Sequence, residues 1–107
     1  MKYMLLAYGE PGPRARDPLL RAIPETGEWV AGAPLADPGL ARTLRVRDGV
    51  AQMTDGPFVD VREQLMGYWL VDCETLDRAL ELAALLPGAG TAAVEVRPLM
   101  DPSGMEM

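Results

Sequence analysis

Histidine is absent from the 107-residue sequence, and cysteine occurs once. Without histidine, neither a Ser-His-Asp triad nor a histidine-based zinc site can form. The single cysteine, Cys73, excludes an intramolecular disulfide, which is typical of a protein in a reducing cytosol. An all-oxygen site for a hard cation is the one metal chemistry left, and no acidic group has the spacing of such a loop. We therefore expect no metal and no cofactor.

Basic residues are also few, since 10 Lys and Arg stand against 16 Asp and Glu and give a net charge of −6. This balance disfavours nucleic acid as a partner, because proteins bind a phosphate backbone by neutralising it with Lys and Arg. No hydrophobic run approaches the roughly 18 apolar residues of a membrane span. The initial run "MKYMLLAYGEPG" is too short for a signal-peptide core. We expect a cytoplasmic protein with no membrane partner.

The length predicts one domain over residues 1–107. A composition of 49% hydrophobic and 24% charged residues indicates a soluble globular protein and not a disordered chain. Aromatic residues make up only 6%, so aliphatic side chains and the seven Met must fill the core.

The strongest helical pattern covers residues 75–88, with Thr75 as a plausible N-cap and a Pro-Gly pair at the end. The i, i+3, i+4, i+7 spacing predicts a buried face made of Leu76, Ala79, Leu80, Ala83 and Leu86. A shorter helix is expected around residues 19–23, between two prolines.

A β-hairpin is predicted where two alternating runs, residues 43–46 and 50–53, flank the turn signal Asp48-Gly49. Further strands are expected at residues 2–8, within 28–39, at 65–73 and at 91–99. The resulting order predicts an α+β fold: a ferredoxin-like βαββαβ antiparallel sheet with an inserted hairpin.

Several of these strands are apolar on both faces. In residues 2–8, Tyr3, Leu5 and Ala7 alternate with Met4, Leu6 and Tyr8. Two helices on one side of a sheet cover only one face, so something else must cover the second. A homodimer through the sheet faces is the expected solution. The alternative is that the hairpin or the C-terminal tail folds over that face.

Four segments resemble the YCII-related family. They read "MKYMLLAYGE", "LRVRDG", "TDGPFVDVREQLMGYWLVD" and "VEVRPLM", and within the family they are most similar to the branch named for its Asp-Gly-Pro-Phe motif. The resemblance implies a ferredoxin-like fold, a dimeric α/β barrel and, through the associations of some relatives, a transcription-related protein partner. It also implies catalysis by a His–Asp pair in the wider family, which this histidine-free chain cannot perform.

The motif itself, residues 55–58, offers two roles for Asp55. Its carboxylate is expected either to accept backbone N–H groups in an Asx turn or to act as a general acid or base in a pocket. Gly56 is expected to supply a backbone angle closed to other residues, and Phe58 to anchor the turn in the core.

Other candidate site residues also have two interpretations each. Arg62 and Glu63 are candidates for substrate binding, with a solvated pair as the alternative. Arg97 is expected to pair with an acid across the dimer or to bind an anion. Tyr8 and Trp69 are candidates for lining a small-molecule pocket, or for packing at the dimer face.

The favoured function is a non-catalytic or regulatory module that binds a small molecule or another protein. The alternative is a small-molecule enzyme that uses Asp55 as acid or base in a cleft between sheet, helix and hairpin. The sequence leaves both open.

Overall fold

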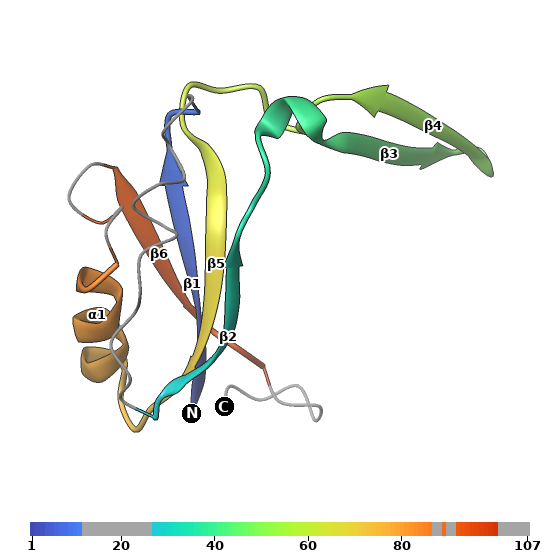
Figure 1. Ribbon diagram of the computed structural model, residues 1–107. Coiled ribbons are helices and arrows are strands. Elements are labelled where there is room, and N and C mark those ends of the chain that lie inside the picture. Colours follow the sequence, from blue (N-terminus) through green and yellow to red (C-terminus); the bar gives the residue numbers. More distant parts are fainter. Residues whose placement is uncertain (12–26, 87–88, 90–91, 101–107) are drawn as a thin grey trace.

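The computed structural model describes residues 1–11, 27–86, 89 and 92–100 (Figure 1). The helix expected around residues 19–23 lies outside them. The described elements, in chain order, are β1 (Lys2–Gly9), β2 (Trp29–Pro34), the 3-10 helix η2 (Pro38–Leu40), β3 (Arg42–Arg47), β4 (Val50–Asp55), β5 (Gln64–Asp72), α1 (Leu76–Ala84) and β6 (Ala93–Pro98).

The main sheet has four strands in the order β2-β5-β1-β6. Every neighbouring pair is antiparallel. The first strand therefore lies in the interior of the sheet, between β5 and β6, which is the strand arrangement of a ferredoxin-like sheet once the hairpin is left out. The predicted α+β fold class is confirmed.

The inserted hairpin, β3 and β4, forms a separate two-stranded sheet. Its turn has positive φ at both central residues, 51° at Asp48 and 77° at Gly49, as a type I′ turn requires. The hairpin projects from the end of the main sheet to the side away from α1 (Figure 1). The hairpin therefore does not fold over the second sheet face, which rules out one of the alternatives to a dimer.

The core lies between the main sheet and α1. Along β1, Tyr3, Leu5 and Ala7 are buried, and the residues between them are partly exposed. Because side chains alternate between the faces of a strand, one complete face of β1 belongs to the core. The buried cluster consists of Tyr3, Leu5, Ala7, Met66, Trp69, Val71, Cys73, Ala79, Leu82, Ala83 and Leu86.

The predicted N-terminus of α1 is confirmed. The hydroxyl oxygen of Thr75 accepts a hydrogen bond from the backbone N–H of Arg78 at 3.1 Å, which satisfies one donor of the first turn. Asp77 lies in that turn, where a negative charge is favourable.

The predicted buried face of α1 is partly wrong. Leu76 and Leu80 are 49% and 48% exposed, whereas Leu82 is fully buried. The face that packs on the sheet is Ala79, Leu82, Ala83 and Leu86, which has the same spacing in a different phase. Two overlapping apolar stripes run along this helix, and only its contact with the sheet selects one of them.

The opposite face of the main sheet is apolar and partly exposed. We call this surface the open face; its described members are Met4, Leu6, Tyr8, Tyr68, Leu70, Glu95 and Arg97. Strand pairing places Leu6 between Tyr68 and Glu95, and Met4 between Leu70 and Arg97. The open face is thus an aliphatic and aromatic surface with charged residues on β6. Among the described residues, no helix is long and apolar enough to cross a membrane.

Candidate functional site

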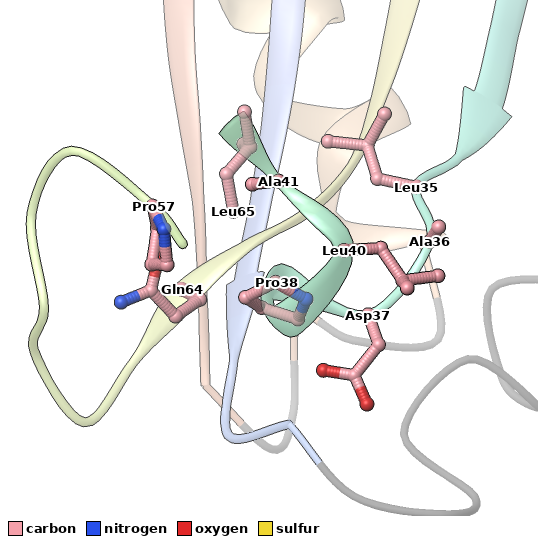
Figure 2. Close-up of a pocket in the computed structure, with 9 residues that line it drawn as sticks. All are labelled: Leu35, Ala36, Asp37, Pro38, Leu40, Ala41, Pro57, Gln64 and Leu65. Carbon is pink, nitrogen blue, oxygen red and sulfur yellow. The ribbon is translucent and has the colours of Figure 1, made fainter. Parts of the chain in front are cut away.

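A pocket of about 340 Å³ lies at the base of the hairpin (Figure 2). Its size falls in the range of small-molecule sites, about 300–1,000 Å³. Most of the side chains around it are apolar. The lining residues are Leu35, Ala36, Asp37, Pro38, Leu40, Ala41, Pro57, Gln64 and Leu65.

One wall of the pocket is the segment that leads from β2 through η2. The backbone N–H of Leu35 donates to the carbonyl of Met66 at 2.8 Å, which ties the segment to β5. The carboxylate of Asp37 accepts from the backbone N–H of Gly39 at 3.3 Å and so caps η2. This wall is therefore held by backbone contacts, and most of its side chains are free to face a ligand.

The other wall comes from the loop between β4 and β5. The side-chain amide of Gln64 donates to the carbonyls of Val59 at 2.7 Å and Val61 at 3.0 Å, which fixes the loop. Pro57 is the member of the Asp-Gly-Pro-Phe motif that lines the pocket.

Gly56 joins the two walls. Its φ of 97° confirms the predicted backbone angle. Its N–H donates to the carbonyl of Ala41 at 2.8 Å, and its own carbonyl accepts from the hydroxyl of Thr43 at 2.8 Å. The motif therefore anchors the hairpin base and turns the chain toward β5.

Asp55 does not line this pocket. Its carboxylate pairs with the guanidinium of Arg42 across the hairpin at 3.1 Å, and its side chain is 84% exposed. The predicted core position of Phe58 is wrong, since this residue is 65% exposed. The loop that carries Phe58 lies outside the sheet. The guanidinium of Arg45 stacks over the Phe58 ring, 4.7 Å from its centroid.

The other predicted site residues are not brought together. Arg62 pairs with Glu10, and its side chain is 87% exposed. Glu63 is exposed in the same loop. Neither residue lines the pocket at the hairpin base.

The three remaining candidates lie on the main sheet, on different faces. Arg97 pairs with Glu95 on β6. Tyr8 is partly exposed on the open face. Trp69 is 5% exposed and belongs to the core beneath α1. Its indole therefore lies on the opposite side of the sheet from Tyr8.

A second pocket, of about 450 Å³, surrounds the start of α1. Arg78 and Glu28 both line this pocket. They form a bidentate ion pair with N–O distances of 2.9 and 2.7 Å. This hydrogen-bonded pairing raises the pKa of the guanidinium. The two partners are 50 residues apart, so no local pattern in the sequence signals the pair.

Cys73 lines this second pocket and is buried. Burial raises the pKa of its thiol, and the nearby negative charge of Glu28 raises it further. The thiol also donates to the carbonyl of Thr75 at 3.5 Å. A neutral buried thiol is a poor nucleophile. The part of the chain that the structure describes contains no group of three or more Cys, Asp or Glu placed to hold a metal ion.

A comparison with protein families shows which family this chain is related to. The model of the YCII-related domain matches residues 1–103. The chain belongs to the YCII-related family. This membership confirms the resemblance found in the sequence segments, and it covers both pockets and the hairpin.

A curated relative of this YCII-related chain is the uncharacterized protein R00369 from Rhizobium meliloti (strain 1021). The two are 42% identical over 81 residues, which is 74% of this chain and 65% of the relative. The match thus spans slightly less than two thirds of the relative's length.

Proposed function

We propose that this YCII-related protein is a non-catalytic module that binds a small, mainly apolar molecule in the pocket at the hairpin base. The observation that carries the proposal is the lining of this pocket. Seven of its nine residues are Ala, Leu or Pro, and the other two are Asp37 and Gln64. Apolar walls with a few polar groups are the usual composition of a small-molecule site.

The two polar side chains limit the chemistry of the ligand. The amide N–H₂ of Gln64 is occupied by backbone carbonyls, and one carboxylate oxygen of Asp37 receives an N–H. Both side chains retain oxygen atoms that can accept further hydrogen bonds. A fitting ligand is a compact apolar molecule that carries a hydroxyl or N–H donor.

The placement of the charged candidates favours binding over catalysis. A general acid or base must reach its substrate and is usually tuned by a buried setting. Asp55 is 84% exposed and paired with Arg42, outside the pocket lining. Cys73 and Arg78, whose pKa values are both raised, surround the other pocket.

The proposal includes a homodimer that forms through the open face. Tyr68 and Leu70 on β5 and Met4 and Leu6 on β1 form a contiguous apolar area there. The hairpin leaves this area uncovered (Figure 1). Apolar areas of this kind are rare on monomers, and a two-fold axis would bury the same area on both copies.

The binding function is tested with 1-naphthol, an apolar probe with one hydroxyl donor. We expect saturable changes in the ¹H–¹⁵N NMR signals of residues 35–37, of residues 39–41 and of Leu65. Ala41→Phe places a ring in the pocket and should weaken the affinity at least tenfold. Ala84→Phe is the matched control, because Ala84 is exposed on α1, away from the open face, and does not line the pocket.

Equal affinities of both variants and the wild type would contradict the proposed site. Protein purified from its native cells should also carry a small apolar molecule in native mass spectrometry. Recovery of a stoichiometric protein partner and no such molecule would instead favour an interaction module, such as the transcription-related role that the resemblance implies. Turnover lost in Asp55→Ala would favour the enzyme alternative.

A further inference from the structure

We propose that the hairpin, residues 42–55, is an arm that packs against a second copy of this chain. The inference rests on the proposed homodimer and adds to it the contact that this hairpin makes. Each copy would then contribute an arm to the other, as a two-fold axis requires.

The hairpin has one apolar face. Strand pairing sets Leu44 opposite Met53 and Val46 opposite Ala51, so these four side chains share one face. Leu44, Val46 and Met53 are 63%, 64% and 66% exposed. The opposite face carries Thr43, Arg45, Arg47, Gln52 and Thr54 beside Val50. A hairpin with one apolar face gains stability when another layer buries that face.

Nothing within the described chain buries that face. The hairpin is fixed at its base, where Thr43 bonds to Gly56 and Arg42 pairs with Asp55. Beyond the base, all residues of both strands are exposed. An isolated two-stranded hairpin is at best marginally stable in water, and stability comes when a further layer covers its apolar face.

The direction of the hairpin points to a second copy as that layer. The hairpin leaves the main sheet on the side away from α1, which is the side of the open face (Figure 1). A second copy docked on the open face would therefore lie beside the arm. The apolar surfaces of the arm and of the open face would be buried in one continuous interface.

The distribution of charge along the chain also favours a second copy as the partner. Residues 42–55 contain three Arg and two Asp, a net charge of +1, so the rest of the chain carries −7. Two exposed acids lie where β5 ends: Asp72, which pairs with the N-terminal amine, and Glu74. The hairpin instead joins the main sheet near the start of β5.

When two sheets face each other about a two-fold axis that crosses the strands, the start of one β5 lies opposite the end of the other. Arg47, which lies beside the turn at the tip of the arm, would then approach the acidic end of the partner. Complementary charges of this kind fix the orientation of an interface and speed its assembly.

The test compares substitutions on the two hairpin faces in the full chain. Leu44→Lys and Met53→Lys place a charge on the apolar face and should raise the dimer Kd at least tenfold in sedimentation equilibrium. Gln52→Lys and Thr54→Lys are matched controls, since they add the same charge to the hairpin on its polar face. We expect the controls to change the Kd less than threefold.

A photo-crosslinker supplies an independent measurement. p-Benzoylphenylalanine at position 46 is introduced in ¹⁵N-labelled protein, which is mixed with unlabelled wild-type chain. Mass spectrometry should find crosslinks from the labelled hairpin to unlabelled peptides that contain residues of β1 or β5. The readout does not depend on any loss of affinity, so a poorly folded variant cannot imitate it.

The possible outcomes distinguish the proposed hairpin contact from the proposed dimer itself. A wild-type dimer whose Kd is unchanged by Leu44→Lys and Met53→Lys, with no crosslink between copies, overturns the arm and leaves the proposed dimer standing. An 11.6 kDa species at all concentrations overturns both. The naphthol experiment tests ligand binding separately in either case.

Discussion

The indole ring of Trp69 packs directly against the backbone of Gly32. The two residues are paired across β2 and β5. A Cβ atom added at Gly32 would lie 2.3 Å from Cδ1 and 2.7 Å from Cγ of the indole, and 2.7 Å from the carbonyl oxygen of Tyr68. Gly32 is therefore required for close packing.

Gly32→Ala should lower the free energy of unfolding by about 1–3 kcal/mol, the usual cost of overpacking. The ring cannot easily move away, because Trp69 is only 5% exposed and lies in the core. Urea denaturation followed by tryptophan fluorescence measures the change. Gly39→Ala is the control, because the nearest atom to its added Cβ would be 3.9 Å away. Equal stabilities of the two variants would refute the packing argument.

The packing of α1 gives a second prediction. Leu82 is fully buried and Leu80 is 48% exposed, although both belong to apolar stripes of the same helix. Leu82→Ala should cost about 2–5 kcal/mol, because it removes core contacts and leaves a cavity. Leu80→Ala should cost clearly less. A larger loss at Leu80 in thermal or urea unfolding would mean that the helix packs in the phase expected from the sequence.

This helix shows how far the sequence could predict the fold. Strands and the hairpin turn were predictable because their signals are local: apolar runs, alternation and the Asp48-Gly49 pair. The phase of α1 was not, because two stripes satisfy the same spacing. Phe58 was misplaced for a related reason, since its burial depends on what lies beneath a loop and not on its own hydrophobicity.

The candidate pocket was less predictable than the fold. Its walls come from residues 35–41 and from the segment around Pro57 and Leu65, which the chain brings together only through the hairpin base. Charged residues such as Asp55 and Arg62 stand out in a sequence, because such residues carry chemistry in many proteins. Apolar residues of a loop have no comparable signature, although Pro57 belongs to a motif that the sequence did single out.

Cys73 gives a prediction on pH. Burial raises the pKa of its thiol above the ordinary value of 9.0, and the charge of Glu28 adds to the effect. Above about pH 9 the unfolded chain begins to lose this proton while the folded chain keeps it. Stability is therefore fully present below the unfolded pKa and is lost as the pH rises toward the folded one.

Cys73→Ala removes this titration. The wild type should lose more free energy of unfolding than the variant between about pH 8 and about pH 10, as measured by urea denaturation at each pH. All other groups are common to both proteins, so their contributions cancel in the difference. Parallel pH profiles would show that the thiol does not contribute. Iodoacetamide should also label Cys73 slowly in the folded protein and quickly in urea, since a buried neutral thiol is unreactive.

The Asp-Gly-Pro-Phe motif gives the last prediction, a comparison of its first two residues. The φ of 97° at Gly56 is unfavourable for residues with a Cβ atom, and no atom lies within 4 Å of a Cβ added there. Gly56→Ala should thus cost about 1–2 kcal/mol through the backbone angle alone. Asp55→Asn removes only an exposed pair with Arg42 and should cost less than about 1 kcal/mol.

Urea denaturation of both variants, with NMR signals of the pocket residues as a second readout, decides between a structural and a chemical motif. If the glycine holds the hairpin base, Gly56→Ala should also weaken naphthol binding, because Gly56 bonds to Ala41 in the pocket wall. Asp55→Asn should leave that affinity unchanged. If the motif were catalytic, the order would be reversed: Asp55→Asn would have the larger effect and Gly56→Ala the smaller one.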